Sequence, residues 1–173
     1  MERFIALNPC RKIPVLEDGD FKIAESAAII AYLAESYGSR NCRLLPVGRL
    51  ERARWTEWSF FIAMELDATA LYVIRRHGGL PRIYGEAPAA VQSARTYFST
   101  QLQHVDATLR AGGPFLMGDQ FTTADILLTT CLTDAIMRDV PVYDSCYAYL
   151  ERITSREAYR KALAANAAKS QHS

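Results

Sequence analysis

A change of hydrophobic period inside residues 8–33, NPCRKIPVLEDGDFKIAESAAIIAYL, constrains the fold more than any other feature of the chain. Residues 13–16 form a short apolar run, and Phe21 and Ile23 alternate with polar or small neighbours, which predicts two half-buried strands. The Asp-Gly pair at residues 18–19 favours a tight hairpin turn, because such a turn needs a positive φ that glycine adopts without strain.

Beyond Glu25 the period becomes that of a helix. Apolar side chains share one helical face at Ile29, Ile30, Leu33 and Tyr37. Gly38 is predicted to end this helix with a left-handed cap. Ser26 lies at the junction of strand and helix, where its hydroxyl and the free backbone N–H groups of the helix start can bind a carboxylate. The segment therefore predicts a β-hairpin and a helix with an anion-binding junction between them.

The rest of the chain carries helical patterns and no convincing strand. Residues 39–48, which include Pro46 and Gly48, interrupt the periodicity and are predicted to be a linker. Helices are expected over residues 49–76, 91–109, 126–137, 144–153 and 155–167. The predicted fold class is α+β and mostly α, with a hairpin-plus-helix domain in residues 1–38 and an all-helical domain in residues 49–173.

Thr122 and Asp125 have the spacing of a capping box. In this motif the hydroxyl caps the first helical turn, while the acid reaches back to the amide of the capping residue. The helix that follows is apolar nearly all round, so it is expected at the centre of the bundle. Asp125 is accordingly predicted to stabilise the fold and not to act as a catalytic acid.

The charge and hydropathy of the chain argue against several classes of function. A net charge of +1 over 173 residues leaves no electrostatic footprint for nucleic acid. The small basic pair Arg75-Arg76 is predicted to lie on a solvated helix face. No apolar run approaches the ~20 residues of a membrane-spanning helix. The N-terminal residues also lack the pattern of a secretory signal peptide.

Cysteine and histidine spacing gives no sign of a metal or disulfide site. The four cysteines form no C-x-x-C pair, and the three histidines lie in no ligand-spaced motif. We therefore predict no metal, reduced thiols and a cytoplasmic location.

The segments NP, KIPVL, DG and AES, in that order, resemble the glutathione-binding part of cytosolic glutathione transferases, especially the theta-type and bacterial members. Gly118, Thr122, Ala124 and Asp125 resemble the box that opens the core helix of that family's second domain. The resemblance implies a thioredoxin-like domain followed by an all-α domain. It also implies that the sequence starts partway into the family pattern, without the opening strand–helix–strand unit that carries the catalytic Ser, Cys or Tyr.

The resemblance implies a glutathione site made of Lys12, Ile13, Pro14, Glu25 and Ser26. In that role the Ile13 backbone, ahead of a cis Pro14, pairs with the cysteinyl part of the tripeptide. Glu25 and Ser26 hold the γ-glutamyl group, and Lys12 reaches the glycine carboxylate. On the residues alone, the plainer interpretation is that Lys12 and Glu25 are solvated charges and that Ser26 caps a helix.

No residue takes the family's catalytic position. Cys10 is a weak candidate, because Arg11 and Lys12 are its only nearby cations and no base accompanies it. Tyr72 and Arg75 are candidates for the lining of an electrophile pocket. Their alternative roles are a packing tyrosine and a surface arginine.

The function implied by the resemblance is that of a detoxifying glutathione transferase. Such a protein conjugates the thiol of glutathione, its co-substrate, to a small apolar electrophile, and it is a homodimer without a tightly bound cofactor. This chain is expected to be weak or inactive, since the catalytic segment is absent. One alternative is a non-catalytic glutathione transferase-like module for protein interaction. Another is a glutathione-dependent isomerase or dehalogenase on the same scaffold.

Two helices, at residues 29–37 and 49–76, are expected to face the partner of that dimer. The strand predicted at residues 13–16 is expected to have an open edge, which invites pairing with another chain.

Overall fold

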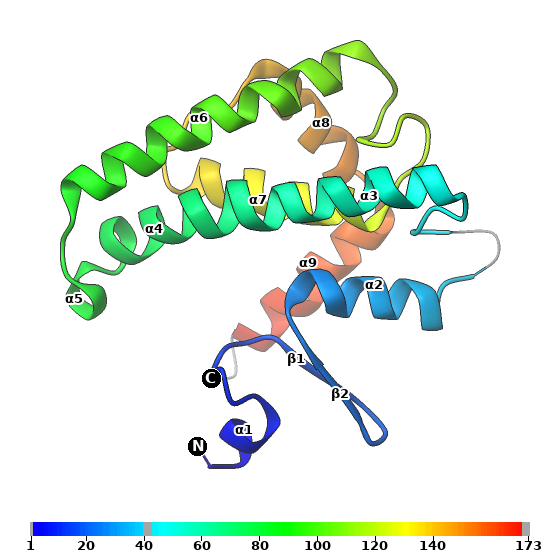
Figure 1. The fold of residues 1–173 in the computed structure, drawn as a ribbon, viewed down its shortest axis with the longest axis horizontal. Coiled ribbons are helices and arrows are strands. Elements are labelled where there is room, and N and C mark those ends of the chain that lie inside the picture. Colours follow the sequence, from blue (N-terminus) through cyan, green and yellow to red (C-terminus); the bar gives the residue numbers. More distant parts are fainter. Residues whose placement is uncertain (1, 40–42, 171–173) are drawn as a thin grey trace.

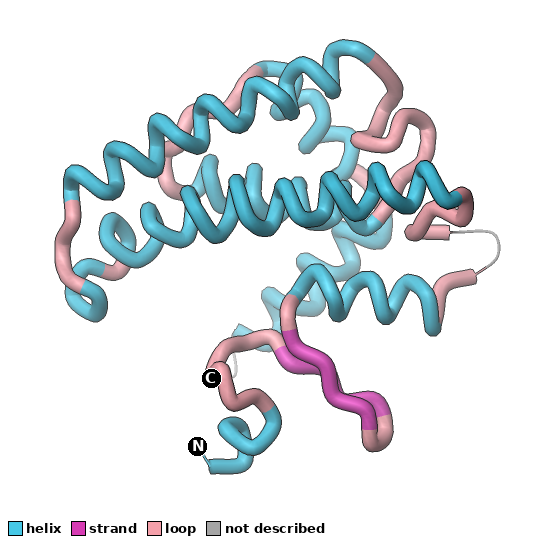
Figure 2. The backbone as a smooth tube through the Cα atoms, viewed as in Figure 1, coloured by secondary structure: helices cyan, strands magenta, loops and turns pink. Residues whose placement is uncertain are grey.

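The computed structural model describes residues 2–39 and 43–170. It has a small N-terminal unit (residues 2–36) lying against one side of a larger helical part (Figure 1). The N-terminal unit contains α1 (Glu2–Leu7), β1 (Val15–Asp18), β2 (Phe21–Ala24) and α2 (Ser26–Ser36). Figure 2 shows the two strands as a single hairpin, and the fold class is α+β and mostly α, as predicted.

The hairpin forms where the alternating pattern placed it. β1 and β2 pair antiparallel, from Val15 opposite Ala24 to Asp18 opposite Phe21. Gly19 in the turn has φ +59°, a conformation that glycine adopts without a steric penalty. Among residues 2–39 and 43–170, β1 has one strand partner, and Ile13 just before it is 83% exposed.

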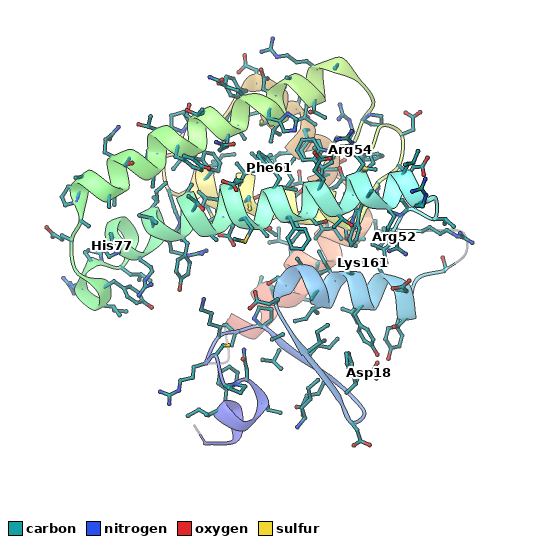
Figure 3. The ribbon with its side chains drawn as sticks, viewed as in Figure 1. Asp18, Arg52, Arg54, Phe61, His77 and Lys161 are labelled. Carbon is teal, nitrogen blue, oxygen red and sulfur yellow. The ribbon has the colours of Figure 1, made fainter. Side chains whose placement is uncertain are left out.

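The end of α2 anchors the hairpin. Asp18, labelled in Figure 3, accepts hydrogen bonds from the phenol groups of Tyr37 and Tyr32, the latter at 2.7 Å. Phe21 packs its ring 5.0 Å from that of Tyr32. The Tyr37 hydrogen bond, and then the Tyr32 bond, lower the pKa of the Asp18 carboxyl, because both stabilise the charged form.

The prediction for Gly38 was wrong. Its φ does not lie in the left-handed region, and Tyr37 ends α2 by donating its backbone N–H to the carbonyl of Leu33. A Cβ atom at Gly38 would lie 2.2 Å from the carbonyl oxygen of Ala34. Glycine is therefore required here by close packing against α2, which the sequence pattern could not reveal.

The helical part is a bundle with one dominant rod. Its helices are α3 (Arg49–Phe61), α4 (Tyr72–Ile74), α5 (Pro81–Tyr84), α6 (Pro88–Ala111), α7 (Thr123–Met137), α8 (Asp144–Thr154) and α9 (Glu157–Ser170). A π-helical stretch, η1 (Ile62–Leu71), joins α3 to α4, and a second, η2 (Arg75–Gly79), continues α4, so that residues 49–79 form one continuous helical rod. The predicted long helix over residues 49–76 is thus confirmed.

The core lies between the rod, α6 and α7. Fully buried side chains include Ile62, Leu66, Leu71, Phe98, Leu102, Leu128 and Leu132. Burying one such side chain stabilises the fold by roughly 1.5–3 kcal/mol. As predicted, α7 runs through the bundle interior (Figure 1), because its apolar residues leave no polar face to expose. None of the helices within the described ranges is long and apolar enough to cross a membrane.

The predicted capping box opens α7. The Asp125 carboxylate is fully buried and accepts a hydrogen bond from the amide of Thr122 at 2.7 Å. It also accepts bonds from the amide of Leu116 and the hydroxyl of Tyr149, both at 2.9 Å. Burial, and then the nearby Asp125 charge, raise the pKa of the Tyr149 hydroxyl, which therefore remains a neutral donor. Asp125 thus ties together α7, α8 and the loop before α7.

Candidate functional site

A cavity of about 430 Å³ lies between the N-terminal unit and the long rod. We call it the inter-domain cavity. Residues predicted from sequence for tripeptide and electrophile binding all line it: Lys12, Ile13, Pro14, Glu25, Ser26, Tyr72 and Arg75. The rod and α7 add an apolar wall that includes Ile62, Met64, Ala68 and Leu127. The fold thus brings together two groups of residues that are far apart in the sequence.

The loop before β1 is held in place by Asn8, which is buried. Its side-chain oxygen accepts the amide of Cys10 at 3.0 Å, and its side-chain nitrogen donates to the carbonyl of Lys12 at 2.7 Å. The Ile13–Pro14 bond that follows is cis. Asn8 also lines the cavity, although the sequence analysis did not name it as a site residue. The available signal was the Asn-Pro pair, since asparagine commonly bonds the backbone two residues ahead.

The junction between β2 and α2 has an unusual backbone. Glu25 has φ +69°, which is uncommon for a residue other than glycine and costs on the order of 1–3 kcal/mol. It precedes α2 at the capping position and makes no capping hydrogen bond with its side chain. Ser26 is exposed and is the first residue of α2, so the interpretation of Ser26 as the helix cap was wrong. The first amides of α2 remain available to an anion.

Tyr72 connects the two parts of the molecule across the cavity. The Lys12 ammonium lies 5.3 Å from the centre of the Tyr72 ring, and the Arg75 guanidinium lies at the same distance. Arg75 forms ion pairs with Asp67 at 3.4 Å and with Asp134 at 3.6 Å. Arg75 is therefore a half-buried, paired arginine and not a free surface charge.

Asp67 is a cavity residue that sequence reasoning missed. Burial raises the pKa of its carboxyl, the Asp134 charge adds to this, and Arg75 acts in the opposite direction. No local motif surrounds Asp67 in the sequence. Its position one to two helical turns before Tyr72 and Arg75 becomes informative only when the cavity-facing side of the rod is known.

The cysteines differ in their relation to the cavity. Cys10 is exposed and is not among the residues that line it. Cys131, on α7, lines the cavity but is buried, and this burial strongly raises the pKa of its thiol. Since the thiolate is the reactive form, Cys131 is unsuited to act as a nucleophile.

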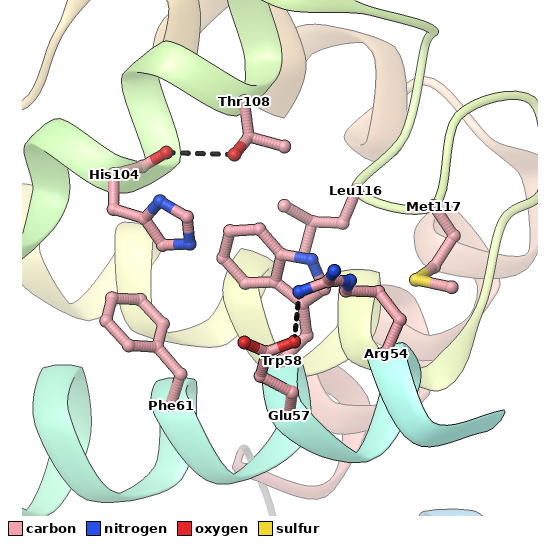
Figure 4. A pocket seen from close by; sticks show the side chains of 8 residues that line it. All are labelled: Arg54, Glu57, Trp58, Phe61, His104, Thr108, Leu116 and Met117. Atoms are coloured by element: carbon pink, nitrogen blue, oxygen red, sulfur yellow. Dashed lines mark hydrogen bonds and ion pairs between the residues drawn. The ribbon is translucent and has the colours of Figure 1, made fainter. Parts of the chain in front are cut away.

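A second cavity, of about 460 Å³, lies between α3 and α6 (Figure 4). Trp58 stacks on His104 with ring centres 4.8 Å apart, and Phe61 meets both rings edge-on. Arg54 and Glu57 form an ion pair at its rim. None of the seven predicted site residues contributes to this cavity, so the candidate site is the inter-domain cavity.

Both parts of the chain match family models of known proteins. Residues 1–35 match the model described as Glutathione S-transferase, N-terminal domain. Residues 88–165 match the model described as Glutathione S-transferase, C-terminal domain. The two matches cover the hairpin side of the inter-domain cavity and most of the helical bundle.

Individual relatives agree with these models. Glutathione S-transferase 3 of Zea mays is 30% identical over 169 residues, which cover 94% of this chain and 75% of the relative. The structure of a glutathione transferase from Methylococcus capsulatus str. Bath is 32% identical, with a TM-score of 0.77 over 94% of this chain and 77% of its own. The structure of BphK, a bacterial GST in a ternary complex, is 26% identical, with a TM-score of 0.81 and coverages of 94% and 78%.

Proposed function

The chain belongs to the glutathione S-transferase family, a family that uses glutathione as co-substrate. On this premise we propose that the chain binds glutathione in the inter-domain cavity and directs its thiol at a small electrophile with an apolar body. One observation carries the proposal: the seven residues named for the two ligands line a single cavity.

The proposed tripeptide lies along the wall made by the N-terminal unit. Its cysteinyl backbone pairs with the backbone of Ile13 as an added strand would. Its γ-glutamyl carboxylate is received by Ser26 and the first amides of α2, and its ammonium group by the Glu25 carboxylate. Its glycine carboxylate reaches Lys12. The strained backbone at Glu25 supports this placement, because such strain tends to occur where a ligand is held.

The proposed electrophile occupies the opposite wall, made by the rod and α7. Met64, Ala68 and Leu127 offer it apolar contact, and Tyr72 and Arg75 bound this region at one end. Holding thiol and electrophile in one cavity makes their encounter effectively intramolecular, which lowers the entropic part of the barrier. The thiol loses its proton to give the thiolate, the reactive form. The thiolate sulfur then bonds to the electrophilic carbon while a leaving group departs with its bonding electrons, or while an activated double bond opens and its other end takes up a proton.

We also propose that the chain is a cytoplasmic homodimer, as members of this family typically are dimers. The surface of α2 and α3 supports this, since Leu33, Leu50 and Phe60 are large apolar side chains that are exposed. Packing these side chains against a second copy of the chain would remove their apolar surface from water and so stabilise a dimer. The same exposed surface favours the second candidate function, a non-catalytic module for protein association.

Isothermal titration with glutathione tests the proposed site. Ser26→Ala is expected to weaken binding by roughly 10- to 100-fold, because it removes a hydrogen bond to a charged group. Ser99→Ala, at an exposed position on α6, is the matched control and should leave affinity unchanged. Failure of the folded wild-type chain to bind glutathione would overturn the proposal. If glutathione does bind, an assay with an apolar electrophile separates the two candidate functions. Turnover by the wild type would favour the transferase, and its absence would favour the non-catalytic module.

A further inference from the structure

Three cations surround a single aromatic ring at one end of the inter-domain cavity. The Lys12 ammonium and the guanidinium carbons of Arg75 and Arg76 each lie 5.3 Å from the centre of the Tyr72 ring. The negative face of an aromatic ring attracts such cations, but it does not cancel their charge. We call this group of four residues the Tyr72 cluster.

The cations of the Tyr72 cluster differ in their acidic partners. Arg75 has ion pairs with Asp67 and Asp134, and Asp134 is in addition bonded at 2.9 Å by Arg138. Within residues 2–39 and 43–170, no ion pair joins Lys12 or Arg76 to an acidic side chain. Two positive charges of the cluster are therefore not neutralised by the described part of the protein.

The Arg76 guanidinium is held between two aromatic rings. It lies over Tyr72 at 5.3 Å and over Tyr84 at 4.1 Å. Its Nε atom is buried and has no hydrogen-bond partner among the described residues. Leaving a buried donor unsatisfied costs about 1–3 kcal/mol, and more for a charged group. The buried Nε atom is itself out of reach of a ligand, so a carboxylate would bind at the terminal nitrogens of the guanidinium, which form no ion pair among the described residues.

Arg76 is not itself among the residues that line the cavity, but its guanidinium lies next to Tyr72, at the electrophile end of the cavity. Ala68, Tyr72 and Arg76 follow one another at four-residue spacing, so they lie on one side of the rod. The first two line the apolar wall of the cavity, and Arg76 extends the same row beyond its Tyr72 end. Lys12, the other unpaired cation, is the residue proposed for the glycine carboxylate.

We infer that the electrophilic substrate carries a carboxylate at one end of its apolar body, and that Arg76 in the Tyr72 cluster binds this group. The inference rests on the proposed function, since it assigns a substrate class to the same cavity. An apolar body of this kind would contact Met64 and Ala68, and its acidic end would lie where the positive charge exceeds the negative.

A matched pair of glutathione conjugates tests the inference by isothermal titration. The probes are S-(4-carboxybenzyl)glutathione and S-(4-carbamoylbenzyl)glutathione, which have nearly the same shape and differ in the charge at the far end. The wild-type chain should bind the carboxylate roughly tenfold more tightly than the amide, as expected for a charge-assisted pair. Arg76→Gln should reduce this ratio to about one and leave the affinity for glutathione itself unchanged.

Arg82→Gln is the control, because Arg82 is an exposed arginine on the neighbouring helix α5 and lies outside the Tyr72 cluster. It should preserve the preference for the carboxylate. Arg76→Lys, which keeps the charge without the planar fork, should retain part of it. Circular dichroism establishes that each variant is folded. The wild-type comparison of the two probes does not depend on any variant.

The outcomes separate this inference from the proposed function. Equal affinity of the wild type for both conjugates, with glutathione still bound, would overturn the inference and leave the proposed function standing. Arg76→Gln that weakens glutathione as much as the carboxylate probe would also overturn it, because Arg76 would then serve the tripeptide. A folded wild type that binds neither glutathione nor either conjugate would overturn both.

Discussion

The N-terminal unit and the helical part differ in how many side chains they bury and in what they contribute to the inter-domain cavity. Among the side chains described for the N-terminal unit, Asn8 and Ile29 are the buried ones, whereas the helical part contains a continuous core centred on the rod and α7. Yet the N-terminal unit contributes the cis Ile13–Pro14 bond, Glu25 and Ser26 to the cavity. The difference teaches that the helical part supplies the buried core, and that the N-terminal unit supplies most of the polar groups of the proposed glutathione site.

The largest expected effect is the loss of unfolding free energy on truncating a core side chain of the helical part, compared with a side chain of the N-terminal unit. Leu132→Ala in α7 should lower the free energy of unfolding by about 2–5 kcal/mol, because it leaves a cavity in a fully packed core. Leu33→Ala on α2, where the side chain is 38% exposed, should cost less than about 1 kcal/mol. Urea denaturation of both variants measures the two values. Equal losses would show that the two parts share one core and would break the comparison.

Asp125→Ala should have the next largest effect, about 2–4 kcal/mol, since it removes a helix cap and leaves the Tyr149 hydroxyl buried without its acceptor. Thermal unfolding is the measurement, and glutathione affinity of the folded variant should not change. Asp125→Asn, which retains an acceptor oxygen, should lose less. An unchanged melting temperature for Asp125→Ala would contradict a structural role for this carboxylate.

Acid should loosen the N-terminal unit through a smaller effect at Asp18. The folded pKa of Asp18 lies below its ordinary value of 3.8, because Tyr37 and Tyr32 donate hydrogen bonds to the charged form. The stabilisation is therefore fully present above pH 3.8 and is lost as the pH falls through the lower folded pKa. Hydrogen exchange at low pH should show earlier opening of β1, β2 and α2 than of α7.

Asp18→Asn removes this titration and serves as the control for the acid experiment. In that variant the N-terminal unit should exchange faster than in the wild type at neutral pH. The difference should disappear at low pH, where the wild-type carboxyl becomes protonated and loses its stabilising charge. A wild-type hairpin whose exchange already matches that of the Asn variant at neutral pH would mean that the Asp18 contacts contribute nothing.

The features that were predictable from the sequence are local ones. The Asp-Gly turn and the Thr122–Asp125 box each depend on residues within a few positions of one another, so their chemistry is visible in a short segment. The bonds from Leu116 and Tyr149 to Asp125 were not predictable, because they join segments nine and twenty-four residues away. The interpretation of Arg75-Arg76 as a solvated pair was wrong for a related reason, since two of their neighbours, Asp134 and Tyr84, come from outside the local segment.

The sequence by itself determined the kinds of element in the N-terminal unit, because backbone periodicity and turn chemistry act over a few residues. The candidate binding residues came from the resemblance of its motifs to the glutathione transferases. Only the tertiary structure decided that Lys12 meets Tyr72, that Cys131 is buried at the cavity while Cys10 is exposed, and that Arg76 has a buried, unpaired donor. Burial and charge pairing depend on which distant segments pack together, and packing is a property of the whole fold and not of a local pattern.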